Sequence, residues 1–140
     1  MCCLVDIKQR VKSLVDKYDT HDPFKIANQL GIHVIYEQLG ETLGYFSKLY
    51  RIPIVHINEN TTKEQQLATC CHELGHAILH PNENTSFLKS KTYFPTSRIE
   101  KEANLFAFEL LSYQGSNQII TVQEAIKDYQ IPEQILSKNF

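Results

Sequence analysis

Two histidines four residues apart, with a glutamate directly after the first, are the residues whose types and spacing most directly indicate chemistry. They are His72, Glu73 and His76. On a helix, residues at i and i+4 lie one above the other with Cβ atoms about 5–6 Å apart, so both imidazoles can reach one tetrahedral ion. Glu73 lies about 100° round the helix from His72, which suits it to meet a water in an open coordination position. This HExxH pattern predicts one Zn²⁺ per chain, with His72 and His76 as ligands and Glu73 as the catalytic base.

A third protein ligand has to come from elsewhere in the chain. His80 continues the i+4 series, but three residues spread over two turns drift about 80° out of phase and cannot easily share one ion. Glu100 and Glu102 lie on a predicted later helix, where Glu100 shares the buried stripe and Glu102 is expected on a more exposed face. We favour Glu100 as the third metal ligand and keep Glu102 as the alternative, although Ser97 and Glu100 also have the spacing of a helix-capping box.

Further side chains could support such a site. Asn104 follows Glu100 by one helical turn and could hydrogen-bond a zinc-ligating histidine. His80 could line the site or serve only the end of its helix. Peptide hydrolysis also needs a hydrogen-bond donor for the developing oxyanion, for which Tyr93 and Tyr113 are candidates, although either could be an ordinary packing residue.

The helix that carries the motif has recognisable ends. Thr61 and Glu64 have the spacing of a capping box that would open it, and Pro81 would stop it directly after His80. Gly75 is unusual in the middle of a helix, where its small size would let another element approach closely.

The other expected elements are read from apolar periodicity and turn residues. Apolar residues between Leu4 and Tyr18 recur at helical spacing, and Asp22-Pro23 begins a short helix that Gly31 ends. Three strands are expected at 32–36, 45–50 and 52–57, the last of them at a sheet edge or with Pro53 near its start.

After the motif, residues 81–96 are expected to form a surface loop. Ser97 would then open a helix whose buried stripe comprises Ala103, Phe106, Ala107, Leu110 and Leu111. Thr121 and Glu124 could cap a later helix. Together these elements predict a single α+β domain over residues 1–140, with a small, mainly antiparallel or mixed three-stranded sheet packed on helices that include the HExxH helix.

Composition excludes several classes of protein. The chain has 140 residues, of which 42% are hydrophobic and 21% charged, as in ordinary globular domains. The formal net charge is −2 and the basic residues do not cluster, so we expect neither direct nucleic-acid binding nor membrane binding. Two adjacent pairs, Cys2/Cys3 and Cys70/Cys71, lack CxxC spacing and suit free thiols in the cytoplasm.

These motifs together resemble the ImmA/IrrE family of metallopeptidases. The resemblance rests on the HELGH segment 72–76 with His80 after it, on Glu100-x-Glu102-Ala103-Asn104-x-Phe106-Ala107 with Leu110-Leu111, and on the strand 54–58. It also covers the short helix, glycine and strand from 23 to 34. One departure is Ser112-Tyr113, where the family often has Met-Pro.

The resemblance implies a gluzincin-like site, with His72, His76 and Glu100 as zinc ligands and Glu73 as base. It also implies that the substrate is a specific intracellular protein, a helix-turn-helix transcriptional repressor in many members. The alternative is a non-catalytic, metal-bound regulator that binds a repressor without cutting it. A purely structural zinc fits less well, because closed structural sites usually have four Cys or His ligands.

Two further hypotheses concern substrate binding and regulation. An extended substrate could pair with a free sheet edge at strand 45–50 or 52–57. Cys70 and Cys71 could form a redox switch beside the zinc ligands, although buried packing on the inner face of the helix is the simpler interpretation.

Overall fold

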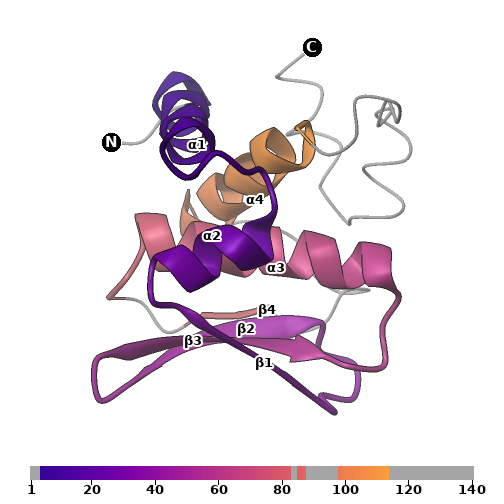
Figure 1. The fold of residues 1–140 in the computed structure, drawn as a ribbon. Coiled ribbons are helices and arrows are strands. Elements are labelled where there is room, and N and C mark those ends of the chain that lie inside the picture. The colour runs from indigo at the N-terminus through magenta and orange to yellow at the C-terminus, as the bar shows by residue number, and fades with distance from the viewer. Residues whose placement is uncertain (1–3, 83–84, 88–97, 114–140) are drawn as a thin grey trace.

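The computed structural model describes residues 4–82, 85–87 and 98–113, which form one mixed sheet and four helices. Figure 1 shows α2 and α3 lying across one face of the sheet, with α1 and α4 on the far side of these two helices. The helices are α1 (Leu4–Tyr18), α2 (Pro23–Gln29), α3 (Lys63–Leu79) and α4 (Arg98–Leu111), and the strands are β1 (His33–Glu37), β2 (Gly44–Leu49), β3 (Ile52–Asn58) and β4 (Thr85–Phe87). The predicted α+β class, with a mixed sheet packed on helices, is confirmed.

The sheet has the strand order β1-β3-β2-β4. β1 runs parallel to β3, and the other neighbours are antiparallel. β4 lies within residues 81–96, so the prediction of a loop throughout that segment is wrong. Its three residues are too few to show a strand periodicity in the sequence. They form a strand because they pair with Gly44–Phe46 of β2.

The position of β3 corrects the expectation of a free edge. β3 is hydrogen-bonded on both sides, so it offers no edge to an extended substrate. Pro53 is the second residue of this internal strand, which confirms the start of a strand rather than an edge. On β2, the residues from Gly44 to Phe46 pair with β4. Within β2, only the remaining residues, 47–49, lack a second partner among the described strands.

Alternation along β3 separates a core face from a polar face. Val55 and Ile57 are fully buried against the helices. On the other face, His56 Nε2 accepts a hydrogen bond from Ser47 Oγ at 2.9 Å, and His56 Nδ1 donates to Glu37. This chain of hydrogen bonds joins β2, β3 and β1.

The start of α3 differs by one residue from the prediction. Thr62, not Thr61, is the N-cap: its hydroxyl accepts from Gln65 N, and the Gln65 side chain accepts from Thr62 N. Thr61 and Thr62 both have a suitable partner three residues later, so both satisfy the capping-box spacing. In the structure the Thr61 hydroxyl belongs to the preceding turn, where it donates to the Asn58 carbonyl, which leaves Thr62 as the cap. The helix ends as predicted, with His80 as C-cap before Pro81.

Two glycines allow α3 to pack closely on both sides. A Cβ on Gly44 of β2 would lie 2.5 Å from the His56 carbonyl oxygen and 2.5 Å from Thr69 Cγ2 of α3. A Cβ on Gly75 would lie 3.1–3.2 Å from side-chain atoms of Phe106 on α4. The expected close approach at Gly75 is therefore present, and it brings α4 against the motif-bearing helix.

The remaining predicted elements also form. Asp22 caps α2 by accepting from Phe24 N at 2.9 Å, Pro23 is its first residue, and Gly31 follows with φ +75°. The predicted stripe of α4 is buried, namely Ala103, Phe106, Ala107, Leu110 and Leu111. The predictions for Cys2, Cys3, Tyr93, Ser97 and the helix near Thr121 fall outside the described residues.

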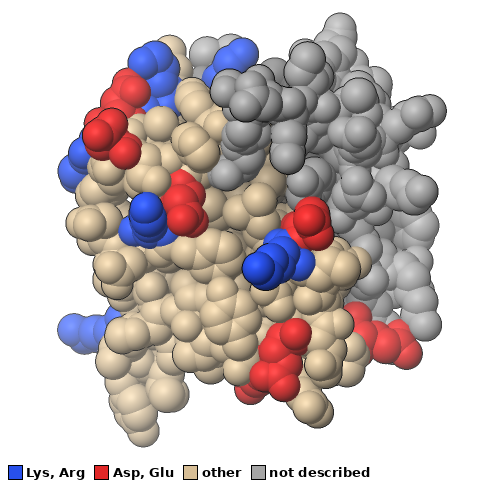
Figure 2. Space-filling model, turned by 45° about the vertical axis from the view of Figure 1, so that its right-hand side comes forward, with Lys and Arg blue, Asp and Glu red and all other residues tan. Residues whose placement is uncertain are grey.

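The surface agrees with the charge pattern of the sequence. On the face shown in Figure 2, acidic and basic side chains are interspersed and no large area has one sign. No described helix is long and apolar enough to cross a membrane.

Candidate metal centre

Three side chains from α3 and α4 converge on one point. His72 Nε2 lies 3.2 Å from Glu100 Oε1, and His76 Nε2 lies 3.2 Å from Glu100 Oε2. One ligand atom from each of these three residues lies within 4.8 Å of the other two. Two ligand atoms that are each about 2.0–2.1 Å from a tetrahedral ion are about 3.3 Å apart, so this spacing fits one metal ion.

The hydrogen bond of His72 Nδ1 determines whether His72 Nε2 carries a proton or a lone pair. His72 Nδ1 lies 2.9 Å from Asn104 Oδ1, in a buried contact between α3 and α4. An amide oxygen only accepts hydrogen bonds, so His72 Nδ1 carries the ring proton in the neutral imidazole. His72 Nε2 is then a lone pair directed at the cluster. The predicted contact between Asn104 and a motif histidine is therefore present.

His76 is held in the same way through a second histidine. His80 Nε2 lies 2.7 Å from Glu102 Oε1, and His80 Nδ1 lies 3.2 Å from His76 Nδ1. A carboxylate oxygen only accepts, so a neutral His80 carries its single ring proton on Nε2 and donates it in a hydrogen bond to Glu102. His80 Nδ1 then accepts a hydrogen bond from His76 Nδ1. This hydrogen-bond chain leaves His76 Nε2 as a second lone pair directed at Glu100.

The resulting arrangement of charges suits a cation. Burial lowers the pKa of His76, which favours the uncharged imidazole. Burial acts to raise the pKa of Glu100, and hydrogen bonds donated by the two histidines would outweigh burial and lower that pKa well below its usual value. Because both rings carry their proton on Nδ1, a cation has to supply that stabilisation instead. Two imidazole lone pairs and one carboxylate then face each other, and they repel without a positive ion between them. Two neutral imidazoles and a carboxylate are a ligand set that zinc accepts.

Glu73 is the most unusual side chain near this cluster. It is fully buried, and neither of its carboxylate oxygens has a hydrogen-bond partner among the described residues. Burial, with a smaller effect of Glu100, raises its pKa well above the usual value. A buried carboxylate without a partner costs several kcal/mol, so its place beside two metal-type histidines calls for a function.

The structure separates the two candidate third ligands. Glu100 is in the cluster with 15% of its side chain exposed, whereas the Glu102 side chain is hydrogen-bonded to His80 and is 5% exposed. The expectation that Glu102 is the more exposed of the two is therefore wrong. The reason is that α4 packs on α3 and on α1, so a wider arc of the helix is covered than one apolar stripe indicates.

Two contacts of Glu102 were not predicted from the sequence. Arg98 Nε lies 3.4 Å from the second oxygen of Glu102, one turn before it on α4, and offsets its buried charge. The pairing of Glu102 with His80 could not be read from spacing, because the residues lie on different helices. Tyr113 lies at the far end of α4, about 16 Å or more along the helix axis from Glu100, and is not brought to the cluster.

The cysteines before the motif are packing residues in this structure. Cys70 and Cys71 are free and fully buried on α3. Burial raises the pKa of both thiols above the usual value, which disfavours the reactive thiolate. These observations support packing rather than a redox switch.

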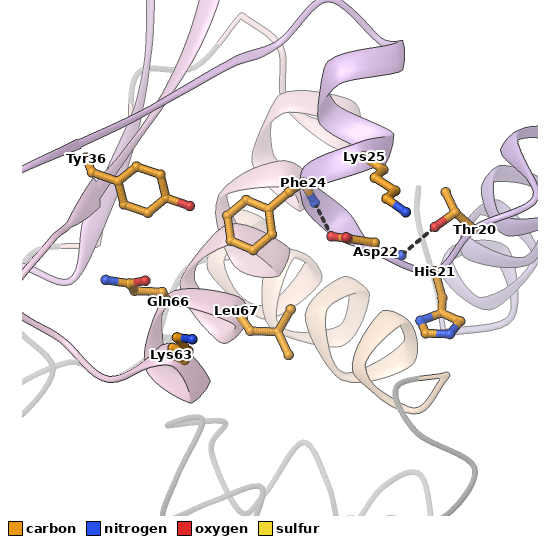
Figure 3. A pocket seen from close by; sticks show the side chains of 9 residues that line it. All are labelled: Thr20, His21, Asp22, Phe24, Lys25, Tyr36, Lys63, Gln66 and Leu67. Carbon is orange, nitrogen blue, oxygen red and sulfur yellow. Dashed lines mark hydrogen bonds between the residues drawn. The ribbon is translucent and has the colours of Figure 1, made fainter.

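A separate cavity lies where α2, β1 and the start of α3 meet. Its volume is about 640 Å³, and Figure 3 shows Phe24 and Tyr36 on one side of it and Lys25 on another. The lining includes Lys63, Gln66 and Leu67 of α3 but none of the three cluster residues. This cavity is therefore separate from the cluster in its lining residues.

Comparison with known proteins places the chain in a family. The model of the IrrE N-terminal-like domain matches residues 27–113, a span that contains every residue of the cluster and its hydrogen-bond partners. The chain belongs to this family. The predicted family, and with it the class of metallopeptidases, is confirmed.

Two relatives extend this result. Over 106 residues the chain is 42% identical to "Uncharacterized immunity region protein 2" of Bacillus phage phi105. The matched region covers 75% of this chain and 67% of that protein. Over 107 residues it is 31% identical to "Metallopeptidase ImmA" of Bacillus subtilis (strain 168), which covers 75% of this chain and 62% of that protein. The chain thus spans about two thirds of the length of these relatives.

Proposed function

We propose that this IrrE-like chain is a zinc-dependent endopeptidase that cleaves a specific protein. The observation that carries the proposal is the convergence of His72, His76 and Glu100 on one point, beside the unpartnered buried carboxylate of Glu73. A site meant only to hold a structural ion would not need that carboxylate, and it would usually have a fourth protein ligand.

In this proposal each cluster residue has one role. His72 and His76 bind the ion through Nε2, and Glu100 binds it through its carboxylate. Asn104 holds the His72 imidazole in the tautomer and orientation that ligation needs. The hydrogen bonds from His76 to His80 and from His80 to Glu102 do the same for the His76 imidazole.

The proton transfers belong to Glu73. Zinc, when bound, acidifies a water and polarises the scissile carbonyl. A Glu73 carboxylate oxygen accepts the proton of the attacking water and then donates it to the nitrogen of the leaving amine. The fully buried position of Glu73 excludes bulk water, which would otherwise weaken its attraction for that proton.

We further propose that the substrate is a helix-turn-helix repressor. Two findings support this step: one relative carries the name of a phage immunity region protein and another is named a metallopeptidase. A peptidase dedicated to one repressor would also fit the resemblance to the ImmA/IrrE family.

The test uses the helix-turn-helix repressor encoded nearest to the gene for this chain. Zinc-loaded wild type and zinc-loaded Glu73→Gln are incubated with this repressor, and fragments are identified by mass spectrometry. Wild type should give defined fragments, and both a chelator and Glu73→Gln should abolish them. If wild type binds the repressor but leaves it intact, the non-catalytic regulator takes the place of the peptidase.

A further inference from the structure

A second concave surface lies where the β2–β3 hairpin meets the helices. It has a volume of about 340 Å³ and lies between α1, the end of α2, the hairpin and the end of α3. Ile32 and Phe46 are buried in its floor, and Ala77 and Ile78 of α3 form a half-buried wall. This surface, here called the hairpin groove, is separate from the metal cluster in its lining residues.

The charge of the hairpin groove has one sign. Arg10, Lys48 and Arg51 line it, all three exposed, and none of the described residues that line it is acidic. None of these three cations forms an ion pair within the described part of the chain. The whole chain has a formal charge of −2, so the groove is positively charged although the protein as a whole is negatively charged. Arg10 lies far in the sequence from Lys48 and Arg51, and therefore no charge run indicated the three together.

The hairpin next to the groove exposes apolar side chains at its tip. Tyr50 is 89% exposed, Leu49 57% and Ile52 47%. Tyr50 and Arg51 form the two-residue turn with φ of +49° and +69°, a conformation that favours Asn or Gly. Tyrosine and arginine are instead the residue types that dominate binding hot spots. The turn thus presents binding-type side chains in a backbone conformation unfavourable to them.

We propose that the hairpin groove docks an acidic, amphipathic segment of the protein substrate. Apolar side chains of that segment would contact the floor and the hairpin tip, while its carboxylates would pair with Arg10, Lys48 and Arg51. That the bound segment belongs to a substrate rests on the proposed function, but the binding itself needs neither metal nor cleavage.

Two other occupants fit less well. A nucleic acid would use the cations but would leave the apolar floor and tip without partners. A second copy bound through a two-fold axis would bring the same three cations against themselves. Charge complementarity therefore favours an acidic polypeptide.

The place of the groove on α3 indicates what docking would achieve. Ala77 and Ile78 directly follow His76 in the sequence but project from a different side of the helix than the ligands. A segment bound there would tether the substrate to the helix that carries the cluster without occupying the cluster. Specificity could then come from a segment remote from the cleaved bond.

The test measures binding of two labelled peptides to full-length, zinc-loaded Glu73→Gln by fluorescence anisotropy. Both peptides are about 15 residues long with leucine on one helical face, and they carry glutamate or lysine on the other. The acidic peptide should bind more tightly than the basic one, and its affinity should fall as NaCl is raised from about 50 to about 300 mM.

Matched variants locate the contact. Arg10→Glu, Lys48→Glu and Arg51→Glu combined should weaken binding of the acidic peptide by about tenfold or more and remove most of its salt dependence. The control combines Lys17→Glu, Lys25→Glu and Lys63→Glu, which makes the same change of net charge outside the groove and should alter the affinity by less than about threefold. Circular dichroism verifies that both variants are folded.

Other outcomes would overturn the proposal. Equal loss of affinity in both triple variants would mean an effect of net charge alone. Tighter binding of a DNA or RNA oligonucleotide that depends on the same three cations would assign the groove to nucleic acid. Dimerisation of wild type that the groove variant abolishes would assign it to a second copy. Failure of repressor cleavage with intact peptide binding would remove only the proposed function.

Discussion

Replacing Gly75 by alanine sets two known effects against each other at the contact that positions the metal cluster. Alanine is favoured over glycine within a helix by about 1 kcal/mol, so the change alone would stabilise α3. The added Cβ would however lie 3.1–3.2 Å from three atoms of Phe106, closer than ordinary van der Waals contact. Phe106 is fully buried and cannot turn away without moving its neighbours. Overpacking of this kind typically costs about 1–3 kcal/mol.

We expect overpacking to win by about 1 kcal/mol, because all three short contacts are to the rigid base of the Phe106 ring. The metal site should be affected too, since relief of the contact moves α4 away from α3 by a few tenths of an ångström. α4 carries Glu100 and Asn104, and metal sites tolerate deviations of only about 0.2 Å in ligand distance. Gly75→Ala should therefore lower both the free energy of unfolding and the affinity for zinc.

The assay is urea unfolding of the zinc-free protein together with a chelator competition for zinc affinity. Phe106→Leu and the double variant complete a cycle that isolates the contact. If Phe106 is the obstacle, Gly75→Ala should cost less, or even stabilise, in the Phe106→Leu background. A gain of about 1 kcal/mol from Gly75→Ala in the wild-type background, with unchanged zinc affinity, would refute the reasoning.

Three further predictions test the hydrogen-bond chain, the turn and the thiols. Glu102→Ala should weaken zinc binding by about 10- to 100-fold in a chelator competition, whereas Glu102→Gln, which keeps an acceptor oxygen, should stay closer to wild type; equal affinities in all three proteins would exclude a role for this carboxylate. Tyr50→Asn combined with Arg51→Gly should raise the free energy of unfolding in urea by about 1 kcal/mol, because it relieves the left-handed turn; a loss of stability would show that the turn is unstrained. Cys70 and Cys71 should not react with a thiol reagent in native protein whose two N-terminal cysteines are serine, because burial raises their pKa and blocks access, and both should react in denaturant; rapid native labelling would reopen the redox switch.

The motif-bearing part of the molecule was predictable because its signals are local. The i, i+4 spacing of His72 and His76 and the close approach at Gly75 lie within one helix, and Pro81 directly follows its C-cap. The capping box was misplaced by one residue, since Thr61 and Thr62 are both followed three residues later by a suitable partner. Local sequence could not choose between two adjacent threonines, whereas the hydrogen bond of Thr61 to the preceding turn does.

The features that depend on contacts between elements were less accessible. Glu102 was expected on an exposed face because a single apolar stripe accounts for only one neighbouring helix, and α4 has two. Strand β4 is three residues long, so its identity comes from pairing with β2. The hairpin groove joins cations from α1 and from the β2–β3 hairpin, and no local pattern relates them.

The most direct test of the account is the zinc affinity of wild type, Glu73→Gln and Glu100→Gln, measured by chelator competition on protein first stripped of metal. Wild type and Glu73→Gln should each bind one zinc per chain with similar affinity. Glu100→Gln should lose more than the roughly 100-fold expected for a residue that only supports a ligand. Full zinc affinity in Glu100→Gln, or no zinc binding by wild type, would contradict a metal centre formed by His72, His76 and Glu100.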